Sequence, residues 1–79
     1  MMLGIPWEMK SPEGGSKTTM KHTVENALEQ SNNIIVDLQR CKLNDDQAIK
    51  DLERQFKLSR RLRRMKIITK DREILDFHK

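Results

Sequence analysis

The spacing of hydrophobic residues changes several times along the chain, and each change predicts a new element. Between residues 18 and 31, and again between 45 and 58, hydrophobic residues recur every three or four positions, as on one side of a helix. Short β-branched or alternating runs around them are typical of strands. The predicted elements are helices at Thr18–Ser31 and Asp45–Leu58 and strands at Ile5–Lys10, Asn33–Gln39, Arg64–Lys70 and Glu73–Phe77.

Helix starts are marked by residues that cap well. Thr18 or Thr19 precedes the first helical pattern, and Asn44 precedes the second. Gln47 lies three positions after Asn44, as in a capping box. These residues support both predicted helices.

The order strand-helix-strand-helix-strand-strand predicts an α+β domain, in which two helices pack on one face of a small sheet of about four strands. Asp71-Arg72 predicts a tight turn between the last two strands. The residues expected in the core are Trp7, Val24, Leu28, Ile34, Val36, Leu38, Ile49, Leu52, Phe56, Ile67, Leu75 and Phe77.

A second organisation fits part of the pattern. From Met20 to Cys41, the residues of a heptad seam recur every three or four positions without interruption. This spacing would allow one long helix to fold back on a second. The asparagine pair at 32–33 and the β-branched run at 34–36 disfavour a helix there. We therefore expect the α+β arrangement, which an unbroken helix over residues 20–41 would contradict.

Size and composition exclude several classes of protein. A chain of 79 residues has the length of one small domain. Its single cysteine, Cys41, excludes an internal disulfide. No apolar run approaches the ~18 residues that a membrane span requires. The opening hydrophobic stretch is too short for a signal peptide.

Positive charge is concentrated in one segment. The chain carries 16 lysines and arginines against 12 acidic residues. A cluster suited to binding a polyanion lies within seven residues and consists of Arg60, Arg61, Arg63, Arg64 and Lys66. The stretch 57–64 also has the spacing of a basic amphipathic helix, so a non-enzymatic module that binds nucleic acid or a protein partner is an alternative.

The segment from Trp7 to Thr18 joins a strand to a helix. It contains a Ser-Pro turn, a glycine pair and the cluster Ser16-Lys17-Thr18. Charged residues beside flexible backbone at such a junction are suited to holding a phosphate.

The ordered set of motifs resembles a known family. These motifs are Trp-Glu-x-Lys-Ser-Pro-x-Gly-x-Ser-Lys-Thr, Ile-Ile-Val-Asp-Leu-x-Arg, Asp-Asp-x-Ala-Ile-Lys and Lys-Ile-Ile-Thr-Lys-Asp, spread from Trp7 to Phe77. They resemble the C-terminal tRNase domains of contact-dependent growth-inhibition and related polymorphic toxins, of the superfold shared by barnase, EndoU, colicin and RelE ribonucleases. The resembling domains carry a further segment ahead of Trp-Glu-x-Lys and a glycine where this chain has Arg72. We expect residues 1–79 to form one small nuclease-like domain that lacks that segment.

The resemblance implies metal-independent cleavage of RNA by attack of the ribose 2′-hydroxyl, with no cofactor. That chemistry needs proton-transfer groups and cations around the phosphate. Histidine is the side chain best suited to proton transfer, and His78 is better placed than His22. The implied catalytic residues are Lys10, Lys17, Arg40, Thr69 and His78. The implied substrate-binding residues are Ser16, Thr18, Lys70, Arg60, Arg61, Arg63 and Arg64.

The resemblance also implies partners and a place of action. It implies RNA, with tRNA as the best substrate candidate, and an immunity protein, with activity in the bacterial cytoplasm. An open sheet edge would allow self-association as a homo-oligomer.

A metal-dependent nuclease is the other enzymatic alternative. Glu8-x-Lys10 has the form of the Glu-x-Lys half of a PD-(D/E)xK site, and the strand period places both side chains on the same sheet face. A hard divalent cation usually requires more than one carboxylate, and no aspartate precedes Glu8. Asp37 would supply the second carboxylate only if its strand aligned it with Glu8.

Overall fold

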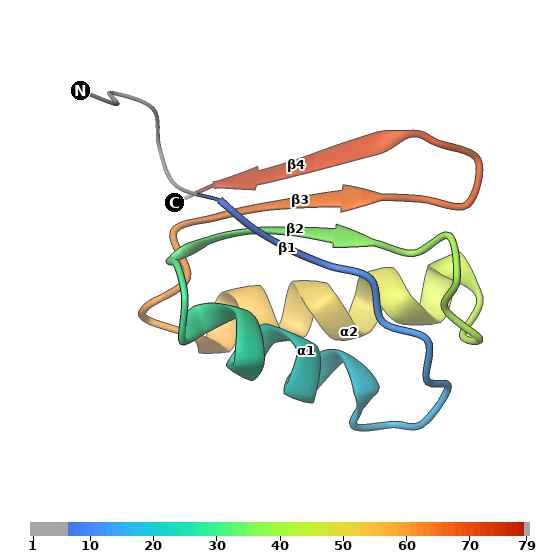
Figure 1. Cartoon of the computed structure of the whole chain (residues 1–79), viewed down its shortest axis with the longest axis horizontal. Helices are drawn as coiled ribbons and strands as arrows, with labels where there is room; N and C mark the ends of the chain where they lie inside the picture. The colour runs from blue at the N-terminus through green and yellow to red at the C-terminus, as the bar shows by residue number, and fades with distance from the viewer. Residues whose placement is uncertain (1–6, 79) are drawn as a thin grey trace.

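The computed structural model describes residues 7–78 as a four-stranded sheet with two helices on one face (Figure 1). Its elements are β1 (Glu8–Lys10), α1 (Thr19–Leu28), β2 (Asn33–Asp37), α2 (Asp45–Leu58), β3 (Arg64–Ile68) and β4 (Ile74–His78). The predicted class and order are confirmed. The long helix over residues 20–41 is wrong, because α1 ends at Leu28 and β2 follows. The predicted strand positions Ile5 and Pro6 lie outside the described residues.

The sheet is mixed, with strands in the order β1-β2-β3-β4. The first three strands are parallel, and β4 is antiparallel to β3. Each parallel connection contains one helix, as parallel neighbours require. The loops after β1, β2 and β3 therefore gather at one end of the sheet, whereas the segment before β3 and the last residues of β4 lie at the other end.

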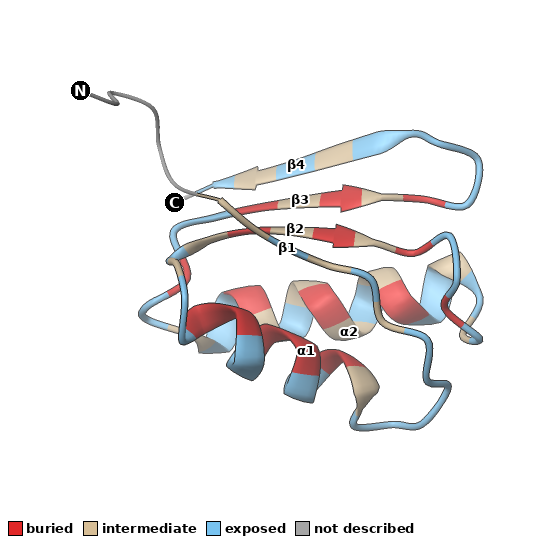
Figure 2. Cartoon of the chain, in the orientation of Figure 1, coloured by how far each residue is buried: buried red, intermediate tan, exposed pale blue. Residues whose placement is uncertain are grey.

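The core lies between the helices and the facing side of β2 and β3 (Figure 2). Its buried hydrophobic residues are Met20, Val24, Ala27, Leu28, Ile34, Val36, Leu38, Cys41, Ala48, Leu52, Phe56, Leu62, Met65 and Ile67.

Four residues predicted in the core are only half-buried. Leu75 and Phe77 lie on β4, an edge strand, and pack against the border of the core together with Ile49. Trp7 does not join this cluster and instead contacts Lys66. The prediction that Trp7 belongs to the core is therefore wrong.

The two helices begin and end differently. The Asn44 side chain caps α2 by accepting a hydrogen bond from the Gln47 backbone N–H at 2.8 Å, as predicted. Thr18 makes no such bond at the start of α1. The first helix also ends earlier than predicted, because the backbone tightens there and the Ala27 carbonyl accepts from both Gln30 and Ser31.

One arginine of the basic cluster fixes the end of α1. The guanidinium of Arg61 donates to the carbonyl of Leu28 at 2.8 Å, and the backbone N–H of Arg63 donates to Asn32 at the same distance. The carbonyls at a helix end have no partner within the helix, so a cation there is favourable. The arginine segment thus joins α1 to the start of β3, with Leu62 buried between the two arginines.

The hairpin between β3 and β4 is held by Thr69. Its N–H donates to the Glu73 carbonyl at 2.9 Å, its carbonyl accepts from Arg72 at 3.0 Å, and its hydroxyl accepts from the Glu73 N–H at 3.0 Å. Arg72 has a φ of 67°, a left-handed conformation that glycine adopts without strain.

We predict that Arg72→Gly stabilises the domain by about 0.5 to 1 kcal/mol, because it removes the left-handed penalty while adding a smaller entropic cost. The measurement is the urea midpoint of unfolding. Arg72→Ala is the control and gives no such gain, since alanine retains the penalty. A loss of stability in Arg72→Gly would contradict the turn geometry.

We predict that Arg61→Gln lowers the free energy of unfolding by about 1 kcal/mol, because it removes a charged donor from the end of α1. Arg60 is exposed and provides a matched loss of charge, so Arg60→Gln leaves the stability within about 0.5 kcal/mol of the parent. Equal effects of the two substitutions on the urea midpoint would show that the Arg61 contact contributes nothing.

Candidate functional site

The helices leave one face of the sheet uncovered. Residues on β2 and β3 alternate between buried and less buried, and the register aligns the less buried positions across the strands. We call this side the open face. Its side chains are Met9, Asn33, Ile35, Asp37, Arg64, Lys66, Ile68, Ile74, Asp76 and His78.

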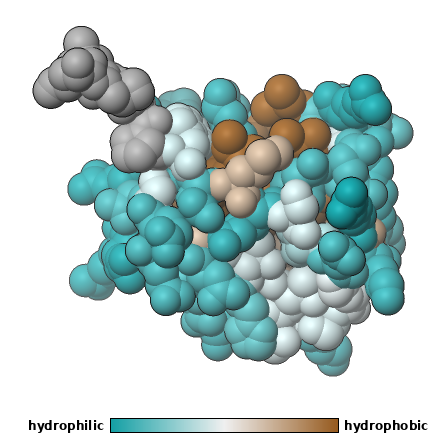
Figure 3. Space-filling model, viewed as in Figure 1, coloured by the Kyte–Doolittle hydropathy of each residue, from teal (hydrophilic) through white to brown (hydrophobic). Residues whose placement is uncertain are grey.

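The open face is divided by polarity along the strands. Toward the hairpin end it is mostly apolar, with Ile68 and Ile74 in register with Asp37, and Met9 is 53% and Ile74 63% exposed. Figure 3 shows hydrophobic surface gathered over the sheet in this view. Toward the other end it carries Arg64, Lys66 and His78, so two cations and an imidazole lie in the half near the arginine segment.

A shallow pocket of about 340 Å³ lies in the polar half of the open face. The register places Arg64 directly opposite His78, and Lys66 directly opposite Asp76. The Lys66 ammonium lies 5.3 Å from the centre of the Trp7 ring, within the range of a cation–π interaction. The pocket is lined by Trp7, Arg64, Lys66, Asp76 and His78.

This combination of side chains suits a nucleotide. Two cations are available for a phosphate, an indole for a base, and an imidazole with a carboxylate for proton transfer. His78 and Asp76 are two positions apart on one face of β4, which places them about 7 Å from each other. Sequence reasoning placed Arg64 and Lys66 in the basic cluster and chose His78 for proton transfer, but it gave no site role to Trp7 or Asp76. The pairing of distant strands brings these residues together.

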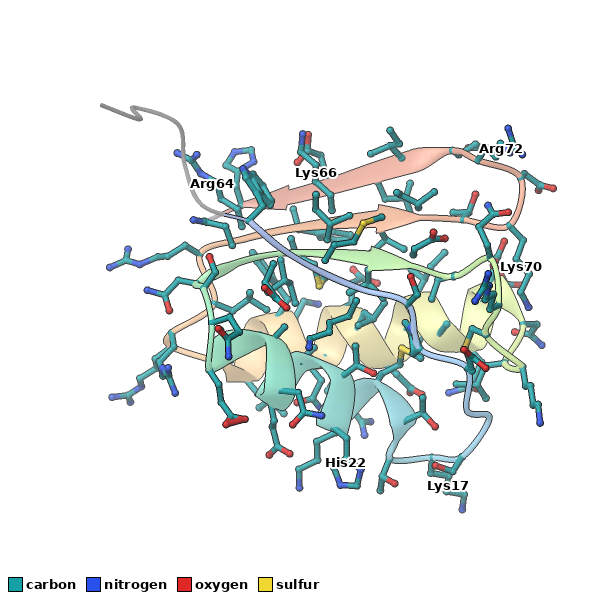
Figure 4. All side chains as sticks on the ribbon, in the orientation of Figure 1. Lys17, His22, Arg64, Lys66, Lys70 and Arg72 are labelled. Atoms are coloured by element: carbon teal, nitrogen blue, oxygen red, sulfur yellow. The ribbon has the colours of Figure 1, made fainter. Side chains whose placement is uncertain are left out.

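The other residues implied by the resemblance do not converge on this pocket. Thr69 follows the opposite end of β3 from Arg64, roughly 16 Å away at the rise of a strand. Thr69 is also 6% exposed, with its hydroxyl engaged in the hairpin. Arg40 is exposed in the loop between β2 and α2. Figure 4 shows Arg64 and Lys66 together on the sheet, and Lys17 and Lys70 far from them.

Ser16, Lys17 and Thr18 lie exposed in the loop between β1 and α1. The Ser16 and Thr18 hydroxyls are 3.3 Å apart. This loop packs against the one that follows β2, because the Cys41 thiol donates to the Gly14 carbonyl at 3.4 Å. A separate hollow there is lined by Gly15, Lys17, Leu43, Gln47, Asp51 and Arg54. A Cβ at position 15 would lie 3.0 Å from the Lys42 Cβ, so Gly15 allows the two loops to pack closely.

Lys70 is held in the structure rather than free. Its ammonium donates to the Leu43 carbonyl, and its backbone N–H donates to an Asp45 carboxylate oxygen at 3.3 Å. These bonds tie the hairpin to the start of α2.

Glu8 and Lys10 form an ion pair of 3.4 Å on the edge strand β1. Both side chains are about one-third exposed, at 30% and 34%. Their strand partners are Ile34 and Val36, so they lie on the helix side of the sheet and not on the open face. Asp37 lies on the open face and therefore does not align with Glu8.

Residues 7–78 lack the side-chain arrangement of a metal site and the helix of a membrane span. No group of three or more His, Cys, Asp or Glu side chains there is arranged to hold a metal ion. Neither described helix has the length and apolar character needed to cross a membrane.

Comparison with known proteins identifies the family. Residues 1–74 match the model of the contact-dependent growth inhibition CdiA C-terminal domain. None of the curated proteins matches the chain. A similar solved structure is the CdiA-CT/CdiI toxin and immunity complex from Burkholderia pseudomallei, with a TM-score of 0.72 and 19% sequence identity. The match covers 92% of this chain but 55% of that one. The chain therefore belongs to the CdiA C-terminal domain family of contact-dependent growth-inhibition toxins.

Proposed function

We propose that this toxin domain cleaves RNA, with tRNA as the best substrate candidate, at the pocket of the open face. The observation that carries the proposal is the meeting of two cations, an imidazole, a carboxylate and an indole on the one sheet surface that no helix covers. The same residues account for metal-independent chemistry without a cofactor. The place of action would be the cytoplasm of the target bacterium.

Cleavage would begin with attack of a ribose 2′-oxygen on the adjacent phosphorus, and the bond to the 5′-oxygen would break. A base takes the 2′ proton and an acid gives a proton to the leaving oxygen, with a cyclic phosphate as product. His78 and Asp76 are the two proton-transfer groups. Arg64 and Lys66 stabilise the charge that develops on the phosphate oxygens.

The remaining implied residues receive different roles. Lys17, Arg40 and the exposed Arg60 and Arg63 would contact parts of a long RNA away from the reacting phosphate, through charge alone. Thr69 and Lys70 serve the hairpin, and Arg61 serves the end of α1. Ser16 and Thr18 stay predicted substrate contacts.

A metal-dependent site at Glu8 and Lys10 is the second candidate. It is favoured by the direct contact of the two side chains on one face of β1. The described residues supply one carboxylate there, because Asp37 lies on the opposite face of the sheet. A divalent cation would need a further carboxylate, so these residues alone do not fit the metal. The open-face pocket is therefore the stronger candidate.

An immunity protein is proposed as the physiological partner. The similar Burkholderia toxin is in a complex with its immunity protein. A partner that neutralises this chain would be expected to present acidic groups to the cationic half of the open face.

The test is incubation of the folded protein with total tRNA, with and without EDTA. We expect cleavage that persists in EDTA and leaves cyclic phosphate ends, and His78→Ala lowers the rate about 100-fold or more. His22→Ala is the matched control and leaves the rate unchanged, since His22 is exposed on α1. Cleavage that requires Mg²⁺ and is lost in Glu8→Gln would move the site to β1. The absence of cleavage in both conditions would contradict the proposed activity.

A further inference from the structure

The only tryptophan of the chain stands at the border of the open-face pocket. Trp7 is half-buried immediately before β1, and the Lys66 ammonium lies 5.3 Å from its ring centre. Lys66 reaches it across the sheet from β3. An indole beside cations on an uncovered sheet is a suitable platform for another flat ring.

The pocket has the size and charge for one nucleotide. Its volume of about 340 Å³ is at the lower end of small-molecule sites. Arg64 and Lys66 are two positions apart on the same face of β3, about 7 Å from each other, so both side chains can reach one phosphate. The same phosphate would draw the Lys66 ammonium away from the ring and leave the indole available to a base.

A base can stack on Trp7 only if at least one face of its ring is not covered by a neighbouring base. In an RNA duplex the bases are stacked on one another, and only the backbone and the groove edges are accessible. The lining combines one indole with two cations, a set that matches a flat base carrying a phosphate. The favoured occupant is therefore an unpaired nucleotide in a loop or at an end.

We propose that the open-face pocket binds a single unpaired nucleotide, with its base stacked on Trp7 and its phosphate between Arg64 and Lys66. The inference rests on the proposed function and specifies the part of the RNA that the site recognises. In this arrangement the Trp7 ring contacts the substrate, whereas a tryptophan in the core would not.

The fluorescence of this tryptophan tests the proposal directly, because the chain has one tryptophan and no tyrosine. The probe is a short single-stranded RNA whose riboses carry 2′-O-methyl groups, so that it cannot be cleaved by its own 2′-oxygen. We expect it to quench the Trp7 emission saturably at low salt. The same strand annealed to its complement quenches at least tenfold less at equal concentration.

Variants separate stacking from charge. With a dye-labelled strand followed by anisotropy, Trp7→Leu weakens binding roughly 5- to 150-fold, the range expected for one lost base–aromatic stack. Trp7→Phe retains most of the affinity, which excludes simple misfolding as the cause. Lys21→Gln removes an exposed charge on α1 and is the matched control for Lys66→Gln. Of these two charge variants, only Lys66→Gln is expected to weaken binding of the RNA strand.

Two outcomes would overturn the inference. Equal binding of duplex and single strand, or equal affinities of Trp7→Leu and the parent protein, would mean that backbone charge alone holds the RNA. The proposed function would still stand after either result if tRNA cleavage proved metal-independent and His78→Ala abolished it. Binding that follows the prediction without any cleavage would instead contradict the activity and keep the nucleotide site.

Discussion

The structure depends on one constraint, which is that both helices cover the same face of the sheet. Each helix connects two parallel strands, and such crossovers have a fixed hand. Successive right-handed crossovers that move along the sheet in one direction place their helices on one side. The strand alternation then divides the chain into residues that meet the helices and residues that do not. Every feature of the candidate site follows from this division.

The covered side supplies the stability. Ile34 and Val36 on β2 and Met65 and Ile67 on β3 are fully buried against the helices. Burying side chains of this kind contributes about 1.5 to 3 kcal/mol each, a large part of the stability of a small domain. This side cannot also carry reactive groups, because an unpaired charge there would be costly. Reactive groups are therefore confined to the open face, the edges and the loops.

The open face combines two kinds of surface that rarely have a purely structural role. Its apolar half exposes Met9 and Ile74, and its polar half gathers Arg64, Lys66 and His78. Because the antiparallel return of β4 places His78 opposite Arg64, one hairpin assembles most of the proposed chemistry. The Arg61 contact with Leu28 then fixes the segment that leads into β3.

The sequence predicted local structure well and long-range placement poorly. The bounds of α2 and its Asn44 cap were predicted because spacing and capping are local properties. The second and third strands were predicted two residues too long at their ends, where turn hydrogen bonds replace strand pairing. The residues of the short strand β1 do not by themselves indicate which of its side chains face the helices. Trp7 was consequently assigned to the core, although its ring lies beside the Lys66 ammonium.

The same distinction explains the candidate site. His78 and Arg64 were identified by residue type, but the sequence contains no signal for the register that joins them. Lys17, Arg40 and Thr69 were grouped with His78 because all stand near strand or helix ends. The structure separates them, because β4 runs antiparallel to β3 and ends away from those loops. Cys41 and Leu62 were missed as core residues because each stands among polar neighbours in a connecting segment.

We propose that RNA binds to the open face. The alternatives are the loops beyond the parallel strands and the β1 edge on the helix side. The most direct test follows backbone amide shifts of ¹⁵N-labelled protein during titration with a short single-stranded 2′-O-methyl RNA. We expect the largest shifts at Trp7, at residues 64–68 and at residues 74–78. Shifts concentrated in residues 14–18 and 40–47, with the open face unchanged, would contradict the proposal.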